Sequence, residues 1–153
     1  MHNVPRGAYY LNWNVMMTPA PAVKQVLLVR KDLKMPPGKI AAQAAHAAQC
    51  SLTHAPANEL RRAPSGGWEL VVPLSDEDVA WLQGEYKKVA LGVSGEEELL
   101  ALLAEAKAAG FRTFLVEDNG HTVFRGRKTI TAVGIGPALA ERVDLVTGHL
   151  RPL

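Results

Sequence analysis

The sequence has 153 residues, of which 48% are hydrophobic and 21% are charged, and its formal net charge is +2. A chain of this length and composition suits one compact domain with one core and argues against a second domain. Its single cysteine, Cys50, excludes an internal disulfide framework, and no apolar run is long enough to span a bilayer. We therefore expect a cytoplasmic protein that makes no contact with a membrane.

The first 22 residues differ in composition from the rest of the chain. They show neither a helical nor an alternating apolar period, and the run from Thr18 to Ala22 alternates with proline, so we expect residues 1–22 to form a flexible arm. The folded domain then covers residues 23–153. It begins with the apolar run from Val23 to Arg30, which predicts a buried strand. The first helix is expected over residues 38–53.

Two later helices are indicated by capping signals. Ser75 followed by Asp78, and Ser94 followed by Glu97, both match the capping box that begins a helix. Gly110 occupies the usual stop position of the second of these helices. The full pattern predicts helices over 75–83, 94–109 and 137–146, and strands over 88–93, 113–116 and 129–133.

Residues 56–73 show the least regular pattern. We interpret them as a variable excursion in which Trp68 to Val72 forms a short edge strand. The rest of the domain alternates strands with helices, which predicts an α/β fold with mostly parallel strands and helices on both faces of the sheet. Only the two strands joined through residues 117–128 are close enough in the sequence to be antiparallel, so the sheet should be mixed.

The first helix should carry three polar side chains on an alanine-rich cylinder. Lys39, Gln43 and His46 lie at i, i+4 and i+7 and so share one face. The turn before the helix is Pro36-Pro37-Gly38, and the free N–H groups of a helix start favour an anion. A second polar cluster, from Glu117 to Thr122, follows a later strand. Because sites gather at the carboxyl ends of strands, we expect the two clusters to meet there.

Each of these residues also has a purely structural interpretation. Asp118 before Gly120 is typical of a turn in which the aspartate ends a strand. Lys39 can be a solvated lysine of the first turn, and His46 can be a hydrogen-bonded packing residue rather than a base. The spacing of His46, Cys50 and His54 permits a zinc site, but burial of Cys50 as a small hydrophobe is favoured.

Basic residues flank both polar clusters. A continuous basic rim of this kind would contact phosphates without reading bases, whereas the alternative is a solvated loop face. The candidates for such a rim at the two clusters are Lys31, Lys34, Arg125, Arg127 and Lys128.

Four blocks of the sequence match a known pattern. They are Asp32-Leu-Lys-Met with Gly38-Lys39-Ile-Ala-Ala-Gln43-Ala-Ala-His46-Ala, then Glu117-Asp118-Asn-Gly120-His-Thr122, then Thr131-Ala-Val-Gly-Ile-Gly-Pro137, and Val146-Thr147-Gly148-His149-Leu150. In this order and spacing they resemble the signature blocks of the archaeal and eukaryotic type of peptidyl-tRNA hydrolase. The resemblance implies a single α/β domain with a four-stranded mixed sheet, usually a homodimer, that hydrolyses the ester joining a peptide to the terminal ribose of tRNA. No cofactor and no metal is implied.

The resemblance also assigns residues. It implies Lys39, Asp118, Thr122 and Thr131 as catalytic residues, Gln43 and His46 as support, and the basic rim as the tRNA-binding surface. The turn between Thr122 and Thr131 is one residue longer than in compact members, which makes Thr129 the alternative to Thr131.

Ester hydrolysis needs a positioned water and stabilisation of the oxyanion. We expect Asp118 to orient or deprotonate that water and Lys39 to act as its electrostatic partner. A catalytically inactive RNA- or protein-binding module of the same fold, and a hydrolase of a related aminoacyl-tRNA ester, are the alternatives.

Overall fold

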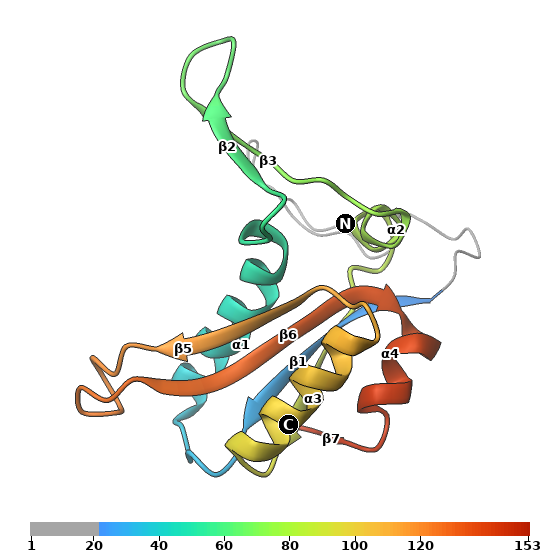
Figure 1. Ribbon diagram of the computed structural model, residues 1–153. Helices are drawn as coiled ribbons and strands as arrows, with labels where there is room; N and C mark the ends of the chain where they lie inside the picture. Colours follow the sequence, from blue (N-terminus) through green and yellow to red (C-terminus); the bar gives the residue numbers. More distant parts are fainter. Residues whose placement is uncertain (1–21) are drawn as a thin grey trace, which may run out of the picture.

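The computed structural model describes residues 22–153, which form a domain of both strands and helices (Figure 1). The predicted flexible arm lies outside the described residues except for Ala22. The elements in chain order are β1 (Val23–Arg30), α1 (Pro37–Thr53), β2 (Glu59–Arg62), β3 (Trp68–Val71), α2 (Asp76–Gln83), β4 (Lys88–Val93), α3 (Glu96–Ala108), β5 (Thr113–Asp118), β6 (Thr129–Leu139), α4 (Ala140–Thr147) and β7 (Arg151–Pro152). Among these helices none has the length and apolarity needed to cross a bilayer.

The main sheet has five strands in the order β5-β6-β1-β4-β7. Only β1 and β4 are parallel, whereas the pairs β5/β6, β6/β1 and β4/β7 are antiparallel. The sheet is mixed, as predicted, but the expectation of four mostly parallel strands is wrong in both number and direction.

The position of β6 explains the difference in strand direction. β6 returns from β5 through residues 119–128 and therefore runs antiparallel to it, as the sequence predicted. It then inserts between β5 and β1, so its other neighbour is antiparallel as well. An alternation of strands and helices does not reveal which strand takes the central place. β7 is two residues long, which is too short to leave any pattern in the sequence.

Helices cover both faces of the sheet, as predicted. Side chains alternate along β1, so Val26 and Leu28 face one core and Leu27 and Val29 face the other. The first core is closed by apolar residues of α3 and α4, and the second by α1. Figure 1 shows α1 and the α3/α4 pair on opposite sides of the strands.

Two helix starts differ in how well the sequence predicted them. The capping box of α2 is confirmed, because the Ser75 side chain accepts from the Asp78 N–H and the Asp78 carboxylate accepts from the Ser75 N–H. The predicted pairing of Ser94 with Glu97 is wrong by one residue. Ser94 donates through its N–H and its hydroxyl to Glu98, at 2.5 and 2.7 Å, and α3 begins after Gly95.

The last predicted helix begins later than expected. Pro137 lies inside β6, whose eleven residues run from Thr129 to Leu139, and α4 begins only at Ala140. Proline suits the first turn of a helix and also the irregular end of a strand, so its presence alone does not separate the two.

The excursion forms a hairpin of its own. The short strand expected at Trp68 is present as β3, but β2 and β3 pair with each other in a separate two-stranded sheet and do not join the main sheet. The hairpin follows the carboxyl end of α1 and projects from the body of the domain (Figure 1).

The approach of α1 to the sheet depends on Gly134 of β6. A Cβ atom at this position would lie 2.3 Å from the Ala47 carbonyl oxygen, so the helix backbone rests directly on the strand. One turn earlier on the same face, Gln43 is 2% exposed. The alanine-rich composition of α1 therefore allows a close approach that places its polar residues over the sheet.

Candidate active site

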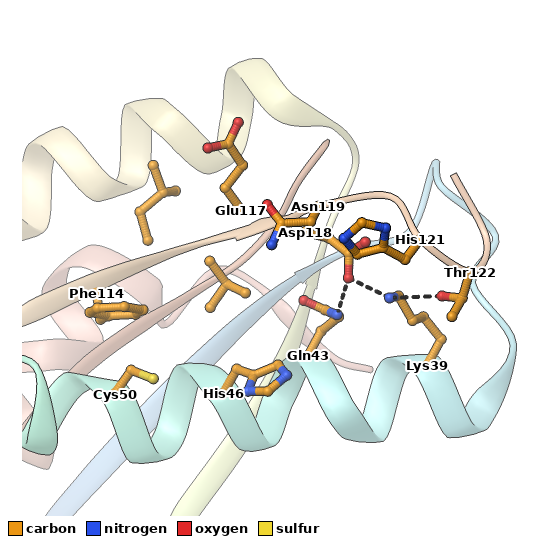
Figure 2. Close-up of a pocket in the computed structure, with 12 residues that line it drawn as sticks. Lys39, Gln43, His46, Cys50, Phe114, Glu117, Asp118, Asn119, His121 and Thr122 are labelled. Carbon is orange, nitrogen blue, oxygen red and sulfur yellow. Dashed lines mark hydrogen bonds and ion pairs between the residues drawn. The ribbon is translucent and has the colours of Figure 1, made fainter. Parts of the chain in front are cut away.

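The carboxyl ends of β1 and β5 lie at the same edge of the sheet, because each strand runs antiparallel to β6 between them. The chain leaves β1 there to enter α1, and it leaves β5 there to form the loop 119–128. Figure 2 shows the side chains of Lys39, Gln43 and His46 on the face of α1 that is turned toward the end of β5. The prediction that the two polar clusters meet is confirmed.

Lys39 and Asp118 form an ion pair at this edge. Nζ of Lys39 contacts Oδ2 of Asp118, and the same oxygen accepts a hydrogen bond of 2.8 Å from Nε2 of Gln43. The side chains of Lys39 and Asp118 are only 14% and 12% exposed. Partial exclusion of water strengthens the attraction between such charges. Lys39 is therefore not the solvated lysine of the structural interpretation.

The start of α1 supplies fewer free N–H groups than the sequence suggested. Pro37 has none, and the N–H groups of Lys39 and Ile40 both donate to the Pro36 carbonyl, at 2.9 and 3.0 Å. The positive charge at this end of the helix that faces the site is therefore the ammonium group of Lys39.

Asp118 also holds the turn that follows β5. Its Oδ1 accepts a hydrogen bond of 2.8 Å from the Gly120 N–H, which is an Asx-type turn. Gly120 has a φ of 84°, and a Cβ atom there would lie 2.5 Å from the Arg127 carbonyl oxygen. The two interpretations of Asp118 are compatible, because one oxygen holds the turn and the other contacts Lys39 and Gln43.

These contacts keep the Asp118 carboxylate ionised. Burial acts to raise the pKa of Asp118, but the hydrogen bonds from Lys39, Gly120 and Gln43, together with the positive charge of Lys39, outweigh it. The pKa of Asp118 therefore lies below its ordinary value. At neutral pH the site contains a carboxylate that accepts hydrogen bonds and donates none.

Thr122 and Phe124 complete the surroundings of the Lys39 ammonium group. Nζ of Lys39 donates to Oγ1 of the exposed Thr122 at 3.2 Å. The same nitrogen lies 5.6 Å from the centre of the Phe124 ring, which belongs to the core below α1. Lys39 is thus held from three sides by a carboxylate, a hydroxyl and a ring face.

Thr131 lies behind the site rather than in it. Its side chain is 0% exposed, and its hydroxyl donates to Oε1 of Gln43 at 2.7 Å. Because this hydrogen bond fixes which end of the amide is the oxygen, the Gln43 NH2 group is left to face Asp118. Thr129, the alternative, donates to the Arg127 carbonyl within its own loop. The structure therefore connects Thr131, and not Thr129, to Asp118.

A cavity of about 480 Å³ opens beside the ion pair. It extends along α1 from Lys39 past His46 to Cys50, with Phe114 of β5 on the opposite side (Figure 2). His46 is exposed in this cavity, so its interpretation as a packing residue is wrong. Cys50 is half-buried, and its burial raises the pKa of the thiol. Among residues 22–153 no three His, Cys, Asp or Glu side chains gather in a way that could hold a metal ion.

Sequence reasoning placed the cluster from Glu117 to Thr122 at the site without assigning a role to Glu117, Asn119 or His121, all of which line the cavity. It missed Phe114 of β5. Asn119 and His121 belong to the Asp-Asn-Gly-His-Thr block of residues 118–122, and this block is the sequence feature that could have identified them. Phe114 carries no such signal, because an aromatic residue in a strand is usually a core residue.

The side chains of the predicted basic rim are all exposed. Lys34 follows β1, and Arg125, Arg127 and Lys128 belong to the loop between β5 and β6. Lys31 lays the stem of its side chain over Gly92, where a Cβ atom would lie 2.7 Å from Lys31 Cδ. None of these five side chains makes an ion pair with another residue of the described part of the chain. Their charges are available to a ligand.

The arrangement suits hydrolysis without a covalent intermediate. A carboxylate and an ammonium group share one edge of a cavity, and no serine, cysteine or threonine in it is paired with a base. A carboxylate can hold an attacking water, and an ammonium group beside it can stabilise an oxyanion.

The comparisons with known proteins agree with this chemistry. The model of the family described as peptidyl-tRNA hydrolase PTH2 matches residues 23–153. A peptidyl-tRNA hydrolase of Methanothermobacter thermautotrophicus is 40% identical over 131 residues, which is 86% of this chain and 100% of the relative. One of Methanopyrus kandleri is 42% identical over 127 residues, covering 83% of this chain and 95% of the relative. The human protein named peptidyl-tRNA hydrolase 2, mitochondrial, is 39% identical over 129 residues, covering 84% of this chain and 63% of the relative.

Proposed function

Because the chain belongs to the PTH2 family of peptidyl-tRNA hydrolases, we propose that Lys39 and Asp118 are its catalytic pair. The protein hydrolyses the ester bond between the peptide and the tRNA of peptidyl-tRNA, which returns the tRNA to use. The observation that supports the assignment is the ion pair itself, which is mostly shielded from water and lies at the mouth of the cavity.

Asp118 positions the attacking water in this proposal. Its carboxylate has about four lone-pair directions, and three of them accept hydrogen bonds from Gly120, Gln43 and Lys39. The remaining direction accepts a hydrogen bond from the water, whose oxygen attacks the ester carbonyl carbon. Since the pKa of Asp118 is lowered, the carboxylate orients the water more effectively than it removes a proton from it.

Lys39 stabilises the charge that the attack creates. The carbonyl oxygen becomes an oxyanion in the tetrahedral intermediate, and an ammonium group within hydrogen-bond distance lowers its energy. The Thr122 hydroxyl, which accepts from Lys39, has its own proton free to donate to the substrate. As the oxygen of the water attacks, its proton moves along the hydrogen bond to the Asp118 carboxylate. When the intermediate collapses and the bond to the ribose oxygen breaks, Asp118 passes this proton to the ribose oxygen and is again ionised.

The variant Asp118→Asn tests this assignment. It keeps the shape of the side chain but removes its charge, and we expect turnover to fall on the order of a hundredfold or more. The measurement is the release of labelled N-acyl-amino acid from N-acyl-aminoacyl-tRNA at neutral pH. The matched control is Asp144→Asn on α4, an exposed carboxylate whose partner is Lys24 on β1. It should retain wild-type turnover.

Wild-type turnover in Asp118→Asn would remove this residue from the mechanism. The substrate itself is tested separately, by comparing an N-acylated aminoacyl-tRNA with a D-aminoacyl-tRNA whose amino group is free. Preference for the second would point to the related ester, and turnover of neither would point to an inactive binding module.

We also propose that the protein works in the cytoplasm as a homodimer. The single cysteine fits a reducing compartment, and the resemblance noted above implies the dimer. Light scattering coupled to gel filtration measures the mass directly, and a mass near 33 kDa, about twice that of the 16.5 kDa chain, is the expected result.

A further inference from the structure

The hairpin formed by β2 and β3 has two faces of different character. Leu60 pairs with Leu70 and Arg62 pairs with Trp68, so these four side chains share one face. Leu60 is 66% exposed and Trp68 is 61% exposed. We call this surface the Trp68 face. The opposite face bears Arg61, which forms ion pairs with Glu69 at 2.6 Å and with Glu59 at 3.6 Å.

The Trp68 face is uncovered in the described part of the chain. A two-stranded hairpin is marginally stable in water, and a large exposed apolar patch usually marks an interaction site. Arg62 already stacks on the indole ring, with its guanidinium carbon 4.2 Å from the ring centre. The guanidinium and the indole thus form a two-layer stack on the exposed face of the hairpin.

The charges of the hairpin favour an anionic partner. Arg62 is the charged residue of the Trp68 face, while both acidic residues of the strands lie on the opposite face beside Arg61. If a second copy of the chain docked through this face, Arg62 would be buried against an identical surface that offers no carboxylate, which is costly. An exposed aromatic ring with an adjacent arginine is instead the combination that stacks on unpaired bases and contacts their phosphates.

The hairpin follows the helix that lines the cavity of the active site. α1 carries Lys39 in its first turn and lines the cavity as far as Cys50, and its 17 residues span about 25 Å. His54 at the end of α1 lies with its ring 5.7 Å from that of Phe114, beyond the cavity, and β2 begins shortly after. If the ester of the substrate lies at Asp118, the attached RNA has to extend out of the cavity. The carboxyl end of α1, at the far end of the cavity from Lys39, leads to the hairpin.

We propose that the Trp68 face binds the acceptor end of the substrate tRNA. Trp68 stacks on an unpaired base and Arg62 contacts the neighbouring phosphate. The proposal rests on the hydrolysis of peptidyl-tRNA proposed above, and it adds a second contact region, separate from the basic rim, that holds the RNA.

The experiment compares neighbouring residues on opposite faces of the hairpin. Trp68→Ala and Arg62→Ala should each raise KM for N-acyl-aminoacyl-tRNA and Kd for deacylated tRNA on the order of tenfold, with kcat little changed. Arg61→Ala removes the same charge from the other face and should leave both constants near the wild-type values. Trp68→Phe, which keeps a ring for stacking, should restore most of the affinity.

A minimal substrate separates an RNA contact from a structural role. All four variants should cleave an N-acylated aminoacyl ester of adenosine at the wild-type rate, because this substrate is too short to reach the hairpin. Wild-type tRNA affinity in Trp68→Ala would overturn the proposal. So would an equal loss on the minimal substrate, or a loss of dimer mass or melting temperature in Trp68→Ala with tRNA affinity unchanged.

The binding and cleavage measurements test the two proposals separately. If the wild-type protein cleaves no peptidyl-tRNA, the proposed function fails, yet the Kd values for deacylated tRNA still decide whether the Trp68 face contacts RNA. If the wild-type protein cleaves peptidyl-tRNA and the Trp68 and Arg62 variants bind tRNA like Arg61→Ala, only the hairpin proposal fails.

Discussion

At the scale of single residues, the structure separates Thr131 from the side chains that face the cavity. The resemblance implied that Thr131 is catalytic, but this residue is fully buried and reaches Asp118 only through Gln43. The helical spacing of Lys39 and Gln43 predicted that they share a face. It did not predict that Gln43 would be 2% exposed, because burial depends on how closely α1 approaches β6.

The buried chain from Thr131 to Asp118 makes a prediction for turnover. Thr131→Val keeps the shape but leaves Oε1 of Gln43 without its donor, so the amide is free to rotate and its NH2 group no longer faces Asp118 reliably. We expect kcat to fall roughly 10- to 100-fold with KM little changed, since small errors in positioning are costly in this range. Thr131→Ser, which restores the hydroxyl, should recover most of the activity.

A merely structural role for Thr131 would give a different result. The unpaired buried oxygen should lower the free energy of unfolding by about 1–3 kcal/mol. If Thr131→Val loses this stability and keeps its kcat at a temperature where it is folded, Thr131 stabilises the fold but does not position Asp118.

At the scale of secondary-structure elements, the sequence predicted where most helices and strands lie in the chain. Beyond the pair β5/β6, it did not predict which strands pair with each other. The α2 capping box and the strand at residues 88–93 follow directly from the local sequence, because caps and apolar runs involve residues close along the chain. The end of β6 was misjudged at Pro137, and the excursion was not expected to form a separate hairpin. The end of β6 depends on its pairing with β1, more than a hundred residues earlier in the sequence. The hairpin is a local contact, but β2 has only four residues, all of them exposed, and so leaves no apolar pattern.

The contact between α1 and β6 can be tested at Gly134. Gly134→Ala places a methyl group 2.3 Å from the Ala47 carbonyl oxygen, so either the helix or the strand must move. Overpacking of this kind costs about 1–3 kcal/mol, and we expect a loss of at least this size in urea unfolding. Turnover should fall as well, because a displaced α1 carries Lys39 and Gln43 away from Asp118.

The control for this change is Gly38→Ala, in the first turn of the same helix. A Cβ atom at Gly38 meets nothing within 4 Å, and alanine favours a helix, so its unfolding free energy should be unchanged or higher. Equal stability of Gly134→Ala and Gly38→Ala would contradict the tight contact between α1 and β6.

At the scale of the whole molecule, the modest net charge of +2 conceals an uneven distribution. The loops after β1 and β5 place basic side chains around the edge of the sheet that holds the site, and the described residues provide no ion pairs for them. The sequence predicted this rim only as one of two alternatives. Its grouping depends on β1 and β5 ending at the same edge, which requires the full strand order.

The rim is tested by reversing its charge. Changing Arg125, Arg127 and Lys128 to Glu should weaken binding to different tRNAs alike, because phosphate contacts do not read sequence. The slope of log affinity against log salt should become flatter by roughly 0.7 to 0.9 for each lost contact. Cleavage of a minimal acyl ester without phosphates should continue at the wild-type rate.

Lys107→Glu on α3, a helix on the other face of the sheet from α1, is the control and should leave the salt slope as it is in the wild type. An unchanged affinity and slope in the triple variant would show that this loop does not contact the RNA.

The central position of β6 also affects when the protein can fold during its synthesis on the ribosome. Val29 of β1 pairs with Ala132 of β6, about a hundred residues later, and Asp118 and Thr131 come from the last third of the chain. Until that segment leaves the ribosome, α1 can pack only on β1, and Lys39 lacks its partner Asp118. A growing chain of this protein is itself a peptide esterified to tRNA, which is the bond that the finished protein cleaves. The site cannot assemble on this growing chain before both β5 and β6 have been synthesised.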